Sequence, residues 1–301
     1  MAAVQGVRCV EVGVGNLEAA ARFYGGIWGL REVVRSAHAG FFRGTGPYHH
    51  ILGLFERTTP ALLRVTFDAP DRAAVDELYA AVDAAKVGPV EEPHALTGPG
   101  GGYGFGFKDP EDRNLAIVAA VADHADAANE PDRPHKITHV NLNSGTPART
   151  AEFFIETLGF ALADETDIFF FLRCNSDHHS IVIHRDTAAT LNHVAFEMPD
   201  LDSVMRGGGR LKDNGYPIEW GPGRHGAGNN VFCYFAGPDE FPIEYTAEVQ
   251  QVDDSYLARG PDYWRVPPGR SDQWGITAPR TPRLHRIQQL FAFAGDHRLA
   301  G

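Results

Sequence analysis

The sequence predicts an α+β protein made of two tandem modules, and three observations predict this class. The first is an internal repeat, in which a strand-helix pattern near the N-terminus recurs about 130 residues later. The second is the composition: 43% apolar residues suffice for a core, and 33 Gly and 20 Pro among 301 residues indicate many turns. The third is a polar stretch with two prolines at 121–135, which separates the halves as a linker.

Each half begins with a strand that leads into a helix. The expected strands are residues 7–13 (VRCVEVG) and 137–143 (ITHVNLN). Asn16 and Thr146 stand where each following helix needs an N-cap, and Gly159 is the expected C-terminal stop of the second helix. The opening of the second half therefore repeats that of the first.

The later parts of the halves also match. Residues 62–81 (LLRVTFDAPDRAAVDELYAA) align without a gap with 191–210 (LNHVAFEMPDLDSVMRGGGR), a half-buried strand that runs into a turn and a helix. We therefore expect an N-terminal module over residues 1–122, a second module over 136–248, and a C-terminal tail over 249–301 that packs on the modules.

Charge and composition exclude several classes of partner. Lys and Arg number 27 against 39 Asp and Glu, and the net charge of −12 argues against nucleic acid or an anionic membrane surface. No apolar run approaches the roughly 18 residues that span a bilayer, and no secretory signal is visible. Three cysteines, Cys9, Cys174 and Cys233, cannot form a disulfide framework. We therefore expect a cytoplasmic protein with no nucleic-acid and no membrane partner.

The two halves differ at three matched positions. A lone histidine on a strand is usually a core or surface residue. Here, however, three residues of types that bind metals in the second half are all replaced in the first. His139 is matched by Cys9, His193 by Arg64 and Glu244 by Ala116. This joint difference favours a metal site within residues 136–248. Two histidines and one carboxylate suit the facial triad of non-haem Fe(II), and Zn or Mn also tolerates this set.

A longer motif surrounds the glutamate of this set. Residues 221–244 (GPGRHGAGNNVFCYFAGPDEFPIE) contain His225, then Tyr234 nine residues later and Glu244 ten residues further. With the two candidate ligand histidines, this motif resembles the type I extradiol catechol dioxygenases of the vicinal oxygen chelate (glyoxalase–bleomycin resistance–dioxygenase) superfamily. The second half is similar to their catalytic module and the first half to their metal-free companion module.

The resemblance implies a fold, a metal and a reaction. The fold is the vicinal oxygen chelate fold, in which each module has paired βαβββ repeats that form curved, barrel-like mixed sheets. The metal is Fe(II), or alternatively Mn(II), held by His139, His193 and Glu244. The reaction inserts both atoms of dioxygen into a catechol in aromatic degradation and yields a 2-hydroxymuconic semialdehyde type product. Members of the family commonly assemble into homo-oligomers.

The resemblance also implies roles for three further residues. Tyr234 would hydrogen-bond the metal-bound catecholic oxygen, and His225 would orient the substrate or move its proton. His178, fifteen residues before His193, is expected to be the distal catalytic histidine that assists dioxygen. His179 is the alternative candidate for this role, because strand alternation lets only one of the two histidines face the metal easily.

The substrate preference rests on one residue, and two alternative functions remain open. The branch that cleaves homoprotocatechuate has an arginine directly before the GPGRHG run, where this chain has Trp220. An apolar aromatic residue there favours an uncharged or aryl- or alkyl-substituted catechol. The alternatives are a glyoxalase-like metal-dependent isomerase or lyase, and a non-catalytic small-molecule-binding protein of the same superfamily.

Overall fold

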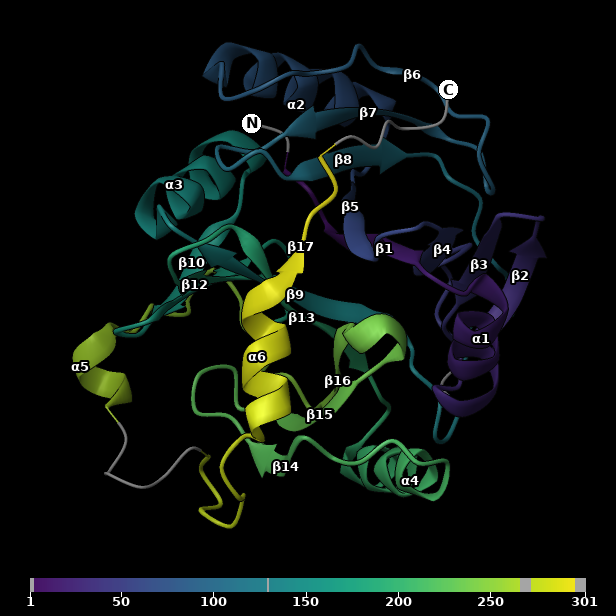
Figure 1. Ribbon diagram of the computed structural model, residues 1–301. Coiled ribbons are helices and arrows are strands. Elements are labelled where there is room, and N and C mark those ends of the chain that lie inside the picture. The colour runs from purple at the N-terminus through teal and green to yellow at the C-terminus, as the bar shows by residue number, and fades with distance from the viewer. Residues whose placement is uncertain (1–2, 129, 266–271, 296–301) are drawn as a thin grey trace.

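The computed structural model describes residues 3–128, 130–265 and 272–295, and it contains two large mixed sheets, one in each half of the chain (Figure 1). The outer ends predicted for the first module and for the tail, residues 1 and 301, lie outside the described residues. None of the helices in the described ranges is long and apolar enough to cross a membrane.

The first sheet has eight strands in the order β2-β3-β4-β1-β5-β8-β7-β6. The elements of this half are β1 (Gly6–Val14), α1 (Leu17–Arg22), the π-helical segment η1 (Phe23–Ile27), β2 (Arg31–Arg35), β3 (Ala39–Arg43), β4 (Leu52–Glu56), β5 (Ala61–Asp68), α2 (Arg72–Ala85), β6 (His94–Ala95), β7 (Tyr103–Lys108) and β8 (Asn114–Ala119).

The second sheet repeats this order as β10-β11-β12-β9-β13-β16-β15-β14, and a ninth strand, β17, pairs with β13. The elements of this half and of the tail are β9 (Ile137–Ser144), α3 (Pro147–Leu158), β10 (Ala161–Glu165), β11 (Phe169–Arg173), β12 (Ile181–Arg185), β13 (Thr190–Glu197), α4 (Leu201–Asp213), β14 (Trp220–Arg224), β15 (Val231–Ala236), the 3₁₀ turn η2 (Pro238–Glu240), β16 (Pro242–Ala247), α5 (Pro261–Trp264), α6 (Pro282–Leu290) and β17 (Phe291–Ala292).

This architecture confirms the predicted fold class. Each sheet is built from two βαβββ units, and each unit supplies four neighbouring strands. The first strands of the two units pair antiparallel at the centre of the sheet. These central strands are buried along nearly their whole length, as strands covered on both faces should be. The two sheets therefore offer equivalent positions on β1 and β9, on β5 and β13, and on β8 and β16.

The predicted helix caps behave differently in the two halves. The side chain of Asn16 accepts a hydrogen bond from the amide of Ala19, as an N-cap does. Thr146 occupies the cap position of α3, but its side chain makes no capping bond. Gly159 ends α3 at φ 76°, in the left-handed region that glycine adopts without strain.

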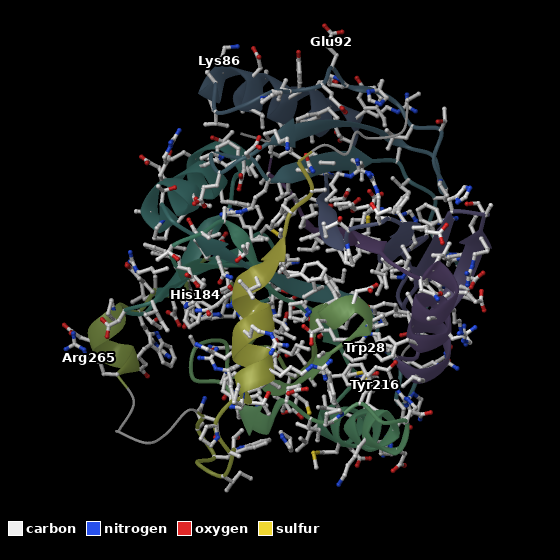
Figure 2. The ribbon with its side chains drawn as sticks, viewed as in Figure 1. Trp28, Lys86, Glu92, His184, Tyr216 and Arg265 are labelled. Carbon is white, nitrogen blue, oxygen red and sulfur yellow. The ribbon has the colours of Figure 1, made fainter. Side chains whose placement is uncertain are left out.

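The first module packs against the strand that carries Glu244. The ring of Trp28 stacks on Tyr245 of β16 at 3.7 Å between ring centres, and the Tyr245 hydroxyl donates to the Trp28 carbonyl at 2.6 Å. Figure 2 shows Trp28 near Tyr216, in the region between α1 and α4. Since adjacent side chains on a strand point to opposite faces, burying Tyr245 between the modules directs Glu244 to the other face of its sheet.

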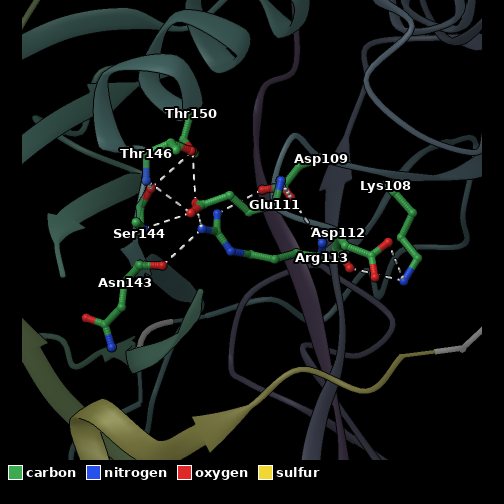
Figure 3. A network of polar contacts seen from close by, with 10 residues as sticks. Lys108, Asp109, Glu111, Asp112, Arg113, Asn143, Ser144, Thr146 and Thr150 are labelled. Atoms are coloured by element: carbon green, nitrogen blue, oxygen red, sulfur yellow. Dashed lines mark hydrogen bonds and ion pairs between the residues drawn. The ribbon is translucent and has the colours of Figure 1, made fainter. Parts of the chain in front are cut away.

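A buried ionic network joins the modules at a second place (Figure 3). Arg113, directly before β8, is fully buried and pairs with Asp109 at 2.8 Å and with Glu111. It also donates to the carbonyl of Asn143 on β9 at 2.9 Å. The Glu111 carboxylate accepts from the hydroxyl of Thr150 on α3 at 3.0 Å. The β7–β8 turn of one module thus holds the first strand and helix of the next.

The tail lies over the second sheet. Helix α6 contacts β13, β15 and β16, and its Leu284 and Ile287 are buried in a cluster with Phe232 and Tyr234 of β15. In Figure 1 the helix crosses in front of this sheet, and the chain then continues through β17 toward the first module. The face of the sheet that carries Tyr234 is therefore covered by residues from the C-terminal part of the chain.

Candidate metal centre

Three side chains converge on one face of the second sheet. His139 on β9, His193 on β13 and Glu244 on β16 are all buried, and one potential ligand atom of each lies within 4.8 Å of the others. Nε2 of His193 is 3.1 Å from Nε2 of His139 and 3.0 Å from Oε2 of Glu244. The strand register explains the convergence, because Ala195 of β13 is directly opposite both His139 and Glu244 on its neighbours.

The donor atoms of this cluster fit a divalent metal ion. Both carboxylate oxygens of Glu244 are buried without a hydrogen-bond partner among the described residues. Burial alone would raise the pKa of the Glu244 carboxyl, but the two facing imidazoles lower it well below its usual range. Burial lowers the pKa of His193, so its ring is neutral near pH 7. An ionised carboxylate and imidazoles with lone pairs turned to one point are the donor set of a metal site.

A chain of side-chain amides, which begins at Gln288 in the tail, orients one of these imidazoles. Nδ1 of His193 lies 2.8 Å from Oδ1 of Asn192, so Nδ1 donates and Nε2 keeps its lone pair for the cluster. The same Asn192 oxygen accepts from Nε2 of Gln288 on α6 at 3.0 Å. Gln288 is buried, and its main-chain carbonyl accepts from the side-chain amide of Asn143 at 2.6 Å. The sequence interpretation missed Asn192 and Gln288, because only the folded chain brings α6 to β13.

Tyr234 and His225 lie beside the cluster and contact each other. The Tyr234 hydroxyl is 3.1 Å from Nε2 of His225, and the Tyr234 ring meets the His193 ring edge to face at 5.0 Å. Nε2 of His225 is 4.0 Å from Oε1 of Glu244. Burial raises the pKa of the Tyr234 phenol well above its ordinary value and lowers the pKa of His225 to about 4. The pair therefore presents a neutral phenol and a neutral imidazole.

The two adjacent histidines point to different partners. The ring of His179 is 4.4 Å from the ring of His139, centre to centre, whereas Nε2 of His178 is 2.9 Å from Oδ2 of the buried Asp164. The Nδ1 atoms of the two histidines are 3.1 Å apart. Since Asp164 accepts the proton of His178 Nε2, His178 Nδ1 accepts from His179 Nδ1, and Nε2 of His179 is the nitrogen that can take up a proton.

This geometry favours His179 over His178 for the role of distal histidine, and the assignment itself stays a prediction. The fifteen-residue spacing to His193 pointed to His178 instead. The pair precedes β12, which begins at Ile181, so its two residues are not part of that strand. The loop after His225 adds a second contact, since a Cβ on Gly228 would lie 2.7 Å from Cε1 of His179. Asp164 carried no signal in the sequence, because its partners come from distant segments.

Trp220 lies next to the Tyr234–His225 pair, together with a cation that the sequence interpretation missed. Its ring stacks on that of Tyr234 at 5.0 Å between centres and lies 5.5 Å from that of His225. The guanidinium of the exposed Arg280 lies 5.4 Å from the centre of the Trp220 ring. The rim of the site thus has an aromatic face and an exposed positive charge.

Comparison with known proteins links this chain to one group of proteins. The family model described as "Glyoxalase/Bleomycin resistance protein/Dioxygenase superfamily" matches residues 6–117 and 136–245. A solved structure described as the Mn(II)-bound glyoxalase from Novosphingobium aromaticivorans is 38% identical, with a TM-score of 0.89 over 94% of each chain. A variant of homoprotocatechuate 2,3-dioxygenase from B. fuscum shares the fold, with a TM-score of 0.84 over 95% of this chain and 82% of that one, at 19% identity.

Two curated relatives carry dioxygenase names. Metapyrocatechase 2 of Cupriavidus necator is 29% identical over 145 residues, which is 43% of this chain and 45% of that protein. The manganese-dependent 2,3-dihydroxybiphenyl 1,2-dioxygenase of Geobacillus genomosp. 3 is 24% identical over 253 residues, 74% of this chain and 78% of that protein. The match to metapyrocatechase 2 thus spans less than half the length of that relative.

Proposed function

Because this chain belongs to the Glyoxalase/Bleomycin resistance protein/Dioxygenase superfamily, we propose that its second module catalyses extradiol cleavage of a catechol by dioxygen. Both oxygen atoms enter the product, and the ring opens beside the diol to give a 2-hydroxymuconic semialdehyde type product. We propose Fe(II) as the metal, held by His139, His193 and Glu244, with Mn(II) as the alternative. The convergence of these three side chains, 3.0 to 3.5 Å apart, is the observation that carries the proposal.

The residues around this cluster meet the needs of a catechol. Three protein ligands leave one face of a divalent metal open, and the bound metal would supply coordination sites there for two vicinal oxygens and for dioxygen. Tyr234, which keeps its phenolic proton, would donate a hydrogen bond to a catecholic oxygen. His225 is neutral and would accept the proton that the catechol loses on binding.

His179 is the proposed distal histidine. Its Nε2 would hold or deliver a proton next to the dioxygen side of the substrate, because its Nδ1 is engaged by His178. His178 and Asp164 then act as positioning residues that hold the His179 ring in one tautomer and orientation. Both are completely buried, which suits a role in holding the ring.

We propose an uncharged, aryl- or alkyl-substituted catechol as the substrate, because the Trp220 ring lies at the rim beside Tyr234. The exposed Arg280 at the same rim would instead favour a catechol that carries a carboxylate, because its guanidinium could pair with that group. A comparison of 3-phenylcatechol with a catechol that carries a carboxymethyl group separates the two. A higher kcat/KM for the phenyl compound supports the proposal, and a higher value for the acid transfers substrate recognition to Arg280.

The decisive experiment mixes anaerobically Fe(II)-loaded protein with a catechol and then admits air. We expect a yellow product and the uptake of one dioxygen per catechol, because both atoms are retained. Mn(II)-loaded protein, measured in parallel, identifies the metal that supports turnover. His193→Ala is the matched control, since it removes one ligand. Loaded protein that consumes no dioxygen with any catechol contradicts the function.

A second candidate is a metal-dependent isomerase of the glyoxalase type. The 38% identity over 94% of both chains with a protein described as a glyoxalase favours it. Against it, the one cluster of potential ligands found among the described residues lies wholly in the second module, and the matched positions of the first have lost these residue types. Isomerisation of a thiohemiacetal without dioxygen uptake, by the same metal-loaded protein, would establish this candidate instead.

A further inference from the structure

A cavity of about 300 Å³ lies in the first module, at the place that corresponds to the metal cluster of the second. The strand register shows the correspondence. Thr66 of β5 is directly opposite Cys9 of β1 and Ala116 of β8, just as Ala195 is opposite the candidate ligands of the second sheet. Cys9 and Thr66 both line the cavity. The first module therefore has a cavity at the position where the second has its candidate ligands, and it lacks that ligand set.

Two side chains of this cavity are counterparts of residues in the proposed active site. Arg64 stands 129 residues before His193, and His50 stands 129 residues before His179. His50 also keeps the local geometry of its counterpart, because its Nδ1 lies 3.0 Å from Nδ1 of the preceding His49. A guanidinium thus occupies the position of a metal ligand, and an imidazole remains at the position of the distal histidine.

Arg64 has hydrogen-bond donors that no described residue uses. Its side chain is about 5% exposed, and its Nη2 pairs with Glu11 at 2.7 Å, but Nε and Nη1 are buried without a partner among the described residues. The other lining guanidinium, Arg8, is already bonded to Asp68 at 2.7 Å and to Asp123 at 3.1 Å. Buried donors without acceptors are unfavourable, so a ligand that brings an oxygen to Arg64 gains by satisfying them.

The rest of the lining is apolar or uncharged except for Glu11, whose carboxylate is paired with Arg64. Burial raises the pKa of Cys9 to about 12 and lowers that of His50 to about 4, so these two groups are neutral near pH 7. A volume of about 300 Å³ is at the lower end of the range for small-molecule sites. The apolar side chains that line the cavity are Phe41, Phe55, Leu96, Val118 and Val121.

We propose that this cavity binds a small aromatic carboxylate. The carboxylate would accept a charge-assisted hydrogen bond from one of the unpartnered Arg64 nitrogens, Nε or Nη1. The ring would lie among the apolar side chains, against the contacting pair of Phe41 and Phe55. The first module is then a second ligand site, separate from the metal cluster and from catechol cleavage.

Isothermal titration of the full chain with benzoate, and with its neutral counterpart benzamide, tests this site. The proposal expects benzoate to bind at least about tenfold more tightly than benzamide. The double variant Arg64→Met with Glu11→Gln removes the guanidinium without leaving a buried carboxylate unpaired, and it should abolish the preference for benzoate. Leu96→Trp, at a cavity-lining residue directly after β6, leaves Arg64 in place and should weaken the binding of both probes by filling the space.

Two control variants locate the binding. Arg22→Met makes the same arginine-to-methionine change at an exposed position of α1 and should leave the benzoate affinity unchanged. His193→Ala should also leave it unchanged if the probe sits in the first module. Loss of benzoate binding in His193→Ala, wild-type affinity in both Leu96→Trp and the double variant, or no benzoate binding by the wild type each overturns the proposal. If the double variant does not fold, Leu96→Trp decides.

Discussion

His50 and His179 occupy equivalent positions in the two modules, and each is held by the histidine directly before it. The Nδ1–Nδ1 distance is 3.0 Å in the His49–His50 pair and 3.1 Å in the His178–His179 pair. The histidine pair is thus present in both halves, whereas the His-His-Glu cluster is present only in the second among the described residues. The pair and the metal ligands can therefore be tested separately.

We expect one divalent metal per chain, and His193→Ala should lose it. The variant removes an imidazole nitrogen that lies 3.0 and 3.1 Å from the other two ligand atoms. Elemental analysis after reconstitution with Fe(II) or Mn(II) measures the occupancy. His38→Ala, at an exposed histidine of the first module, is the matched control and should keep the metal. Wild-type occupancy in His193→Ala would rule out this site.

The two adjacent histidines should respond differently to substitution. His179→Asn should keep the metal but slow the oxygen-dependent step, by about 10²–10⁴-fold if it acts as a general acid–base group. His178→Asn should have a smaller effect, because His178 acts on the substrate only through the His179 ring. Single-turnover kinetics with pre-bound catechol measures both. A larger defect in His178→Asn would return the distal role to His178.

Tyr234→Phe should retain the metal and the fold but lower kcat with a catechol. The change removes only the hydroxyl that contacts His225, at 3.1 Å, and leaves the ring in its place against His193. Steady-state rates over several catechols, with metal content measured on the same samples, provide the check. As a control, Phe232→Tyr adds a hydroxyl elsewhere on the same face of β15. Combined with Tyr234→Phe, it should not restore activity. Unchanged rates in Tyr234→Phe would assign Tyr234 to packing.

Arg113→Met should destabilise the protein strongly. It leaves the buried Asp109 carboxylate without its ion-pair partner and removes the bond to the carbonyl of Asn143, which links the modules. Breaking a buried pair in this way typically costs about 3–5 kcal/mol. Urea denaturation measures the free energy of unfolding, and Arg22→Met, at an exposed ion pair, should change it by less than about 1 kcal/mol. A loss below about 1 kcal/mol in Arg113→Met would contradict the expectation.

His50 should make the protein less stable in acid. Burial lowers its pKa to about 4 in the folded state, whereas an unfolded histidine has a pKa of about 6.5. Between these values the unfolded state binds more protons, so the free energy of unfolding falls as the pH drops from about 6.5 to 4, by up to about 1.4 kcal/mol per pH unit. His50→Gln should reduce this slope, and His38→Gln, at an exposed histidine, should not. Equal slopes in wild type and His50→Gln would refute the assignment.

The sequence alone determined the repeat, the fold class and the candidate metal ligands. Cys9, Arg64 and Ala116 could be matched with their counterparts because both halves follow the same strand order, and a near-constant offset along the chain preserves strand register. The spacing from His225 to Tyr234 could also be recognised from the sequence, because both residues lie near one hairpin, formed by β14 and β15. Features that depend on local order along the chain are the ones that a sequence displays.

Only the tertiary structure decided which histidine lies against the candidate ligands and what orients it. His178 and His179 are adjacent in a segment without strand alternation, so the choice depends on Asp164, which reaches His178 from β10. The orientation of His193 depends in the same way on Gln288, 95 residues further along the chain. Hydrogen bonds between distant segments leave no periodic pattern in a sequence, because their partners meet only when the core has closed around them.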